Sequence, residues 1–340
     1  MRHTLTAALR ACILIAVALP AAIYTIAIAG AVGLDQVARS AARRAHDALF
    51  AYMGRAGLAL GAAQLIPLQP FTNVVPAGIA ISDLSNLFGY TVERLILQLG
   101  GTALTKAMLT GLQLKANGKV IFDSTGVATD AREQYRGITA NANFLTIDFL
   151  ELKARSKLGL MGGAIDTTLG IKNLRLEVTI AGATAPTLAG WAEVSIPQTS
   201  KEYANVRPLI ARVHRNTMTI GGAGTFLLAV PHIDPNQGGS IFKRIAVFSA
   251  NITGARVERS GIREWDVSVA AMNSFNQGEY GRVPQASLFV IDFVVDGLQE
   301  DRVLDTRPAA GCNIAACYGT FSAAETITIE SEVLEPLDVY

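Results

Sequence analysis

The chain has 340 residues, of which 50% are hydrophobic and only 17% are charged, and its formal net charge at pH 7 is +1. This composition excludes intrinsic disorder, which needs low hydrophobicity and high net charge, and it offers no broad basic surface, so we expect no direct binding of nucleic acid. Three cysteines in so long a chain exclude a disulfide-stabilised scaffold. The low charge suits a subunit that buries its flanks against neighbouring subunits.

The N-terminal residues 1–64 carry membrane-type signals. A charge-free stretch of 24 residues runs from Ala11 to Leu34, which is long enough to span a bilayer. Two arginines precede it and three follow closely, which favours a body that stays in the cytoplasm. A secretory signal cleaved near Ala29 is one alternative, and a start codon placed too far upstream is another, because Met53 also fits a start.

Residues 35–60 predict a single amphipathic helix. Small and apolar side chains recur there at spacings of three and four, at Val37, Ala41, Ala45, Ala48 and Tyr52. A basic amphipathic helix beside an apolar span suits a membrane surface, so we expect a lipid bilayer as a partner near the N-terminus. The alternative is an alanine-rich helix that packs on the body.

After Pro70 the hydrophobic pattern changes from the helical period to the alternation of β-strands. Alternating segments at 95–99, 174–180 and 326–330 predict strands, with Gly, Pro, Asn and Ser clusters between them. No long helical pattern intervenes, which argues against a parallel α/β sheet. An all-β body of the sandwich or barrel type is therefore expected.

The body is internally duplicated. A hairpin pattern at 114–123 is repeated at 257–266, with Gly118 and Gly261 at the same turn position. Asn-Gly is a strong hairpin signal, because both turn positions need positive φ. Two further landmarks keep almost the same offset, namely 134–135 with 279–280 and 146–149 with 290–293.

Landmarks repeated in the same order predict two copies of one β-domain, spanning residues 65–204 and 205–340. Each copy is large enough for a core of its own and has room for the eight strands of a jelly roll. A sheet shared by the two halves would contradict two separate sandwiches.

Residues that carry catalysis are scarce, so we predict no enzyme and no catalytic or cofactor-binding residues. The histidines His214 and His232 are isolated in the sequence, and Cys312 and Cys317 form a C-x4-C pattern without a second pair, which disfavours zinc. A structural calcium ion is the cofactor alternative, although no loop has EF-hand spacing. Its candidate oxygen ligands are Asp234, Asp292, Asp296, Glu300 and Asp301.

Asp148 and Asp292 could suggest the paired carboxylates of a glycosidase. They occupy equivalent positions in the two repeats, so they should lie in different domains and far apart. Each alternates with apolar strand residues, and such an acid faces the outer side of a sheet. We interpret both as structural residues.

From Phe71 to Leu337 the body resembles the corticovirus-type major capsid proteins, the coat proteins of phages with an internal membrane. The matching pieces are collinear and spread over both halves. They include KANGKVI at 115–121, FLTIDF at 144–149, EVTIAGATAPT at 177–187 and EYGRVPQA at 279–286, with shorter pieces at 100–102, 135–137, 163–167, 192–195 and 292–296.

The resemblance implies two tandem eight-stranded jelly-roll β-sandwiches, whose trimer is a pseudo-hexagonal tile of an icosahedral shell over a lipid bilayer. It implies as partners the chain itself, then the vertex and minor membrane proteins of the virion. The implied location is the virion capsid, with the host cytoplasm or inner membrane as the site of assembly. The resemblance does not clearly include residues 1–64.

The competing hypothesis is a membrane-anchored or secreted β-sandwich that binds carbohydrate. It predicts a cleaved N-terminus and an exposed aromatic platform. Trp191 and Trp265 are the two tryptophans available for such a platform. Trp265 lies in the hairpin equivalent to the one with Phe122, which favours placement in a core.

Overall fold

The computed structural model describes residues 64–102, 104–155, 159–160, 162–195 and 209–336. The membrane span and the basic helix expected before residue 64 lie outside this range. None of the helices in the described ranges is long and apolar enough to cross a membrane. The chain divides into two compact units, Met1–Ala62 and Ala63–Tyr340, and the second unit contains the whole β body.

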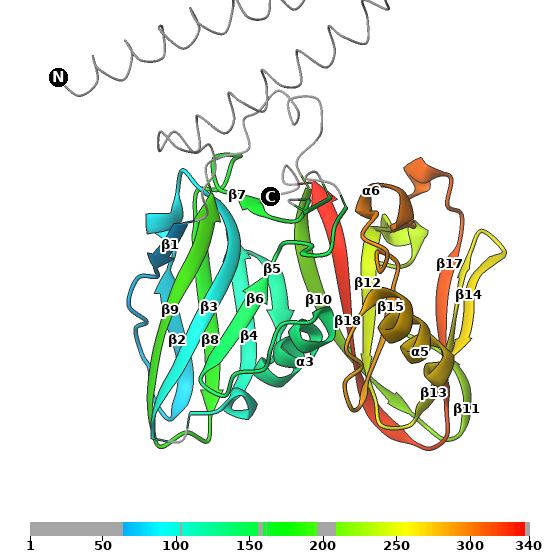
Figure 1. Cartoon of the computed structure of the whole chain (residues 1–340), viewed down its shortest axis with the longest axis horizontal. Helices are drawn as coiled ribbons and strands as arrows, with labels where there is room; N and C mark the ends of the chain where they lie inside the picture. The colour runs from blue at the N-terminus through cyan, green and yellow to red at the C-terminus, as the bar shows by residue number, and fades with distance from the viewer. Residues whose placement is uncertain (1–63, 103, 156–158, 161, 196–208, 337–340) are drawn as a thin grey trace, which may run out of the picture. The chain divides into compact units, whose positions relative to one another are not determined.

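The first half of the body, residues 64–195, is called roll 1 and folds as two antiparallel sheets that face each other (Figure 1). One sheet has the order β1 (Gln64–Pro67), β9 (Ala185–Ser195), β3 (Thr91–Thr102) and β6 (Phe144–Asp148), with the short β7 (Ile165–Asp166) on β3. The other has the order β2 (Ala77–Asp83), β8 (Leu174–Ala181), β4 (Leu109–Ala116) and β5 (Lys119–Ser124).

The second half, residues 209–336, is called roll 2 and repeats this topology strand for strand. One sheet has the order β10 (Leu209–Ile220), β18 (Glu325–Pro336), β12 (Ile241–Phe248) and β15 (Leu288–Asp292), with the short β16 (Leu304–Asp305) on β12. The other has the order β11 (Gly224–Leu227), β17 (Ala315–Phe321), β13 (Ile252–Arg259) and β14 (Ile262–Ser268). Each roll is an eight-stranded jelly roll with one short extra strand, as the sequence predicted.

The two hairpins confirm the turn prediction. Asn117 and Gly118 have φ of 50° and 82°, and the equivalent Ser260 and Gly261 have 50° and 79°. Positive φ at both positions is the type I′ geometry that matches strand twist. Both hairpins also shift register three residues before the turn, after Leu114 in roll 1 and after the equivalent residue in roll 2.

Each roll contains one longer helix that the sequence analysis did not predict. These are α3 (Gly126–Arg136) and α5 (Val269–Tyr280), which stand at the same place in the topology. The side chain of Thr125 caps α3 by accepting a hydrogen bond from the Ala128 N–H, and α3 ends at Gly137 in the left-handed region. These are ordinary start and stop signals, but the helices span only three turns, too short for a clear apolar period. The remaining helices are α6 (Gln299–Arg302) and the 3-10 turns η1 (Ser85–Leu87), η2 (Lys106–Met108), η3 (Pro235–Gln237) and η4 (Pro308–Ala310).

Each roll encloses its own large apolar core. The expectation that the halves share no sheet is wrong at one point, because β5 and β10 pair in parallel through Val213 and Phe122. Both are edge strands, and an edge strand leaves backbone groups that need a partner. The first residues of β10 also belong to the core of roll 1, where Ile210 and Ala211 are buried. The domain boundary near residue 204 stays a prediction.

Candidate functional site: a buried ion-pair network at the junction of the rolls

Each roll carries the same three charged residues on the outer face of one sheet. In roll 1, Arg94 on β3 lies opposite Asp148 on β6 and Glu193 on β9. The Arg94 Nε atom is 3.1 Å from Asp148 Oδ2, and Nη1 is 3.0 Å from Glu193 Oε2. The Arg94 and Glu193 side chains remain 22% and 26% exposed. We call this set the roll 1 triad.

The roll 2 triad has the same construction on the equivalent strands. Arg244 on β12 lies opposite Asp292 on β15 and Glu332 on β18, with separations of 3.1 Å in both ion pairs. All three side chains are buried. The same local register therefore places one arginine between two carboxylates in each roll, but only roll 2 buries the triad.

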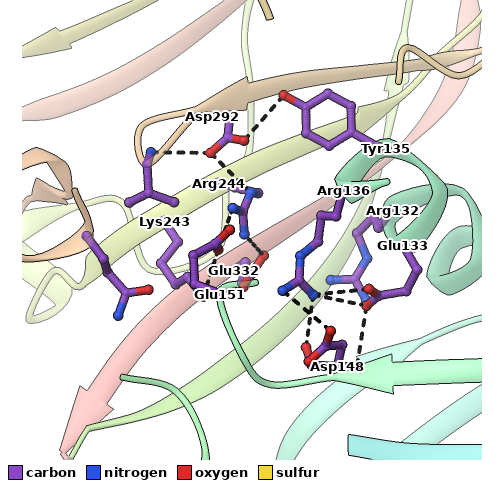
Figure 2. A network of polar contacts seen from close by, with 12 residues as sticks. Arg132, Glu133, Tyr135, Arg136, Asp148, Glu151, Lys243, Arg244, Asp292 and Glu332 are labelled. Atoms are coloured by element: carbon purple, nitrogen blue, oxygen red, sulfur yellow. Dashed lines mark hydrogen bonds and ion pairs between the residues drawn. The ribbon is translucent and has the colours of Figure 1, made fainter. Parts of the chain in front are cut away.

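Residues of roll 1 complete the burial of the roll 2 triad (Figure 2). Glu151, which follows β6, accepts a 2.5 Å hydrogen bond from Arg244 Nη2 and lies 3.3 Å from Arg282 Nη2. Lys243 Nζ lies 2.9 Å from Glu332 Oε1 and 3.5 Å from Glu151 Oε2. One carboxylate from roll 1 thus contacts three cations of roll 2, and this arrangement ties the halves together.

Helix α3 makes the second set of contacts across the junction. Arg132 Nε lies 2.9 Å from Glu330 Oε2 on β18, and Ser124 donates a 2.7 Å hydrogen bond to the same carboxylate. The Tyr135 hydroxyl donates to Asp292 at 3.3 Å and accepts from the Asn276 side chain at 2.9 Å. Around these polar contacts, α3 covers apolar residues of roll 2. We call the whole set the junction network.

On the roll 1 side, Arg136 anchors the end of α3 to the loop after β6. Its guanidinium pairs with Glu133 at 3.0 Å and donates to the backbone oxygens of Asp148 and Leu150. This arrangement fixes the loop that presents Glu151 to roll 2.

The acids of the junction network differ in their pKa values. Burial raises the pKa of Glu133 to about 7, and Arg136 only partly opposes this shift. Burial also disfavours the ionised form of Glu332, but Lys243 and Arg244 outweigh it and hold the pKa of Glu332 well below its usual range. Glu151 shows the same downward direction, because Arg244 and Lys243 outweigh its burial. The direction of each shift therefore depends on whether the neighbouring cations outweigh the effect of burial, as they do for Glu332 and Glu151 but not for Glu133.

The two cavities lined by residues of the junction network are small. Each has a volume of about 10 Å³. Such a volume holds about one water molecule. Fully buried, mutually paired charges of this kind specify a fixed geometry rather than a binding site.

The structure places the two predicted carboxylates in different rolls, one in each triad. Asp148 and Asp292 lie on outer sheet faces as expected, but both are buried, Asp148 beside Arg136 at the end of α3 and Asp292 beside Tyr135 of α3. Each is held by an arginine, at 3.1 Å in both cases. They are structural charges of the junction.

The candidate calcium ligands are scattered. Asp234 caps η3, Asp292 belongs to the roll 2 triad, and Asp296 lies 3.4 Å from Arg302. The side chains of Glu300 and Asp301 lie outside the described set. Within the part of the chain that the structure describes, no three His, Cys, Asp or Glu residues are grouped so that they could hold a metal. A structural calcium ion stays a prediction.

The expectation that the two histidines are isolated is wrong. The rings of His214 and His232 lie 4.1 Å apart, and His214 Nε2 is 3.7 Å from Glu335 Oε1. The reason is tertiary, since β10 and the loop after β11 bring together residues 18 positions apart. Burial and the neighbouring His214 lower the pKa of His232. Cys312 and Cys317 are both buried as free thiols, and burial raises the pKa of Cys317 to about 12.

Most of the junction network was missed from the sequence. A signal was present in the segment 241–248, where Lys243 and Arg244 stand inside an otherwise apolar strand. Cations rarely occupy a buried strand unless they are paired, so this pattern indicates ion pairing. The partner Glu151 comes from the other roll, and its sequence neighbourhood does not reveal it.

Two β-sandwiches of the same topology, joined through a buried ion-pair network, define a double jelly-roll protein. The family model of the viral coat protein P2 N-terminal domain matches residues 65–195, and the model of the P2 C-terminal domain matches residues 210–337. The chain belongs to this family of viral coat proteins.

Solved structures support the fold. The major capsid protein P2 of bacteriophage PM2 is 15% identical with a TM-score of 0.65, and the match covers 81% of this chain and 98% of that chain. The VP54 protein of PBCV-1, from a structure fitted into a reconstruction of the virophage Sputnik, is 11% identical with a TM-score of 0.55, covering 81% and 93%. A comparison with curated protein sequences gives no significant match.

Proposed function

We propose that the chain is the major capsid subunit that forms pseudo-hexagonal trimers in an icosahedral shell over an internal membrane. The observation that carries this proposal is the strand-for-strand repetition of roll 1 in roll 2. Two similar rolls in each chain make six in a trimer, so three chains can occupy a hexagonal lattice position. Membership of the P2 coat-protein family supports the role of a structural protein in the virion capsid.

The junction network fits this role because a lattice tile must keep its two rolls at a fixed angle. Glu151, Arg244 and Arg282 are buried ions held by partners from both rolls or from neighbouring strands. Removing one partner from such a set is strongly unfavourable, so the rolls resist rotation against each other. We propose that the chain acts through assembly and has no catalytic role.

The partners proposed are further copies of the chain, the vertex and minor membrane proteins of the virion, and a lipid bilayer near the N-terminus. Support for the bilayer comes from the charge-free stretch between Ala11 and Leu34 and the basic segment after it. During assembly we place the chain in the host cytoplasm or at the inner membrane.

The carbohydrate-binding alternative is not supported. Of the two tryptophans proposed for an aromatic platform, Trp265 packs on the core of roll 2 and lies edge-on to Phe293 at 5.8 Å, while Trp191 is half-buried. The family matched by the chain is a coat-protein family.

Negative-stain microscopy of the expressed chain tests the proposal. We expect hexagonal trimers from the full chain in mild detergent, and the same trimers from a chain that begins at Ala63, which retains β1. The full chain should fractionate with membranes and the shortened chain should not. A monomeric full chain would contradict the capsid role, whereas a shortened chain found with membranes would contradict the lipid assignment alone.

A further inference from the structure

β5 pairs with β10 inside the chain, whereas the equivalent strand edges, on β14 and β1, pair with no other strand among the residues that the structure describes. Val213 on β10 lies opposite Glu332, and Leu65 on β1 lies opposite the equivalent Glu193, so Leu65 takes the place of Val213. Val213 is 5% exposed under Phe122, whereas Leu65 is 61% exposed. Leu65 therefore lacks a neighbour equivalent to Phe122, which shields Val213 from solvent.

The strand β14 is the counterpart of β5 and is also open. In the described part of the chain no strand pairs with its outer edge, and Ile262 on this strand is 66% exposed. Inside the chain, the edge of roll 1 formed by β5 meets the edge of roll 2 formed by β10. By topology, β14 is the roll 2 counterpart of β5 and β1 is the roll 1 counterpart of β10, so the edges of β14 and β1 are the matching pair of the same contact.

The helices show the same asymmetry. Because α3 and α5 begin 143 residues apart, Arg132 on α3 corresponds to Phe275 on α5, and the buried Thr129 and Glu133 correspond to the buried Met272 and Asn276. This alignment of the helices replaces the offset of 145 that the sequence pattern gave for Tyr135 and Tyr280. On α3 the face with Ala128, Arg132 and Tyr135 is buried, and roll 2 covers Arg132 and Tyr135. The equivalent face of α5 is exposed, and Phe275 on it is 43% exposed. Helix α5 directly follows β14 and lies beside β13, β14 and β15 of roll 2 (Figure 1).

The sheet face that would receive α5 exists on roll 1. In roll 2, α3 covers Ala246, Leu288 and Val290, which are all buried. The register of the two triads places Ile96, Phe144 and Thr146 at the equivalent positions in roll 1, and each of them is half-exposed. This apolar patch lies beside the roll 1 triad, whose arginine and glutamate are also partly exposed.

A pair of substitutions between the repeats fits a contact between the two faces. Arg132 on α3 pairs with Glu330 on β18 inside the chain. The position equivalent to Glu330 is Trp191 on β9, since Ile96 lies opposite Trp191 as Ala246 lies opposite Glu330. The charged pair of the internal junction is therefore replaced by Phe275 and Trp191, so both members changed together from charged to aromatic.

We propose that the α5 and β14 side of roll 2 docks on the outer face of the β1–β9–β3–β6 sheet of a second copy of this chain, with Phe275 against Trp191. This interface repeats the internal junction between copies. It rests on the proposed trimer, because a head-to-tail contact of this type either closes into a ring or extends as a filament. Three copies in this arrangement form a ring of six rolls.

Sedimentation of the full chain in mild detergent tests the assignment. Phe275→Arg places a cation against Trp191 and should raise the concentration at which trimers dissociate about tenfold or more, as expected for a central aromatic contact. Trp191→Glu should have a similar effect. The double variant re-creates the Arg132–Glu330 pair between copies and should recover part of the lost trimers, but not the wild-type level, because both charges must be dehydrated on association. Leu227→Arg on β11, a residue that is 59% exposed outside the proposed interface, is the matched control and should leave trimers unchanged.

The outcomes separate the two proposals. A wild-type chain that is not trimeric contradicts the proposed function. Trimeric wild type with trimers unaffected by Phe275→Arg, or affected equally by Leu227→Arg, contradicts only the interface. Single variants that dissociate without rescue in a folded double variant contradict the pairing of Phe275 with Trp191. If thermal melting shows that Trp191→Glu is unfolded, Phe275→Arg and Leu227→Arg decide by themselves.

Discussion

Roll 1 and roll 2 have the same strands in the same order and carry the same charged triad, but they differ in what covers that triad. In roll 2 the triad around Arg244 lies beneath α3 and the loop with Glu151. In roll 1 the triad around Arg94 is partly open. A duplicated fold presents the same surface twice, and this chain covers only one of the two surfaces with its own residues.

The covered and uncovered surfaces also differ in chemistry. The internal junction uses Arg132 and Glu330, while the open faces carry Phe275 and Trp191 at the equivalent places. An internal junction forms once, during folding, and its ions are then permanently paired. A surface that binds a second molecule is hydrated before association, and charged residues on it would have to lose their water when the complex forms. Because this loss is unfavourable, aromatic residues suit such a surface better.

The largest effect should come from removing Arg244, the arginine of the roll 2 triad, and Arg94 of the roll 1 triad is the matched comparison. Arg244→Leu leaves three buried carboxylates with fewer partners and should lower the free energy of unfolding by about 3–5 kcal/mol. Arg94→Leu should lower it by about 1 kcal/mol, because Arg94 and Glu193 are partly exposed and solvent screens their pairing. Denaturant unfolding of both variants measures the difference. Equal losses would contradict the claim that only the roll 2 triad is buried in a fixed network.

The pKa of Glu133 is raised and that of Glu332 is lowered, so glutamine variants of the two should change stability with pH in opposite ways. Glu133 has a pKa of about 7 in the folded chain against 4.5 unfolded, so the folded state loses stability as pH rises from 4.5 to 7. Glu133→Gln should therefore be neutral at pH 5 and stabilising by about 1–3 kcal/mol at pH 8.

Glu332 provides the control for that profile. Its pKa is lowered, so its contribution is present above pH 4.5 and is lost as the pH falls below that value. Glu332→Gln should be destabilising by about 2–4 kcal/mol at pH 8, with a smaller loss near pH 3. Unfolding curves at three pH values measure both variants. If both variants changed stability in the same direction as the pH rises, the claim that burial dominates at Glu133 and the cations dominate at Glu332 would be wrong.

The hairpin turns test the likeness of the rolls. Gly118→Val and Gly261→Val each place a β-branched residue at positive φ and should lower the free energy of unfolding by about 1–2 kcal/mol. Neither glycine has neighbours within 4 Å of a Cβ atom, so backbone strain alone causes the loss. Lys119→Ala is the control and should have a much smaller effect in the same thermal melts. If either valine variant unfolded with the same free energy as the wild type, a type I′ turn at that position would be wrong.

The smallest effect concerns the helix caps. Thr125 accepts a 3.2 Å hydrogen bond from the Ala128 N–H, and Ser268 accepts one of 3.2 Å from the Ala271 N–H. Alanine at either cap should lower the free energy of unfolding by about 1 kcal/mol, and exchanging Thr for Ser should change it little. If only Thr125→Ala is destabilising, the two helices are not equivalent parts of their rolls.

Local patterns in the sequence were sufficient for the architecture. Alternating strands at 174–180, the Asn117-Gly118 turn and the repeated landmarks near Gly261 depend on neighbours within a few residues, and the structure reproduces them. The resemblance to corticovirus-type capsid proteins identified the family, which the family models then matched. Helices α3 and α5 were missed because three turns carry little periodic signal.

Only the tertiary structure decided how the halves meet. Glu151 and Arg244 are 93 residues apart, and the loop after β11 brings His232 next to His214. No local sequence pattern links the members of either pair. The burial of Asp148 and Asp292 likewise depends on which helix covers each sheet face. Alternation of side chains determines which residues lie on a face, because the strand period is local. What covers that face depends on the packing of distant segments, which the sequence period does not encode.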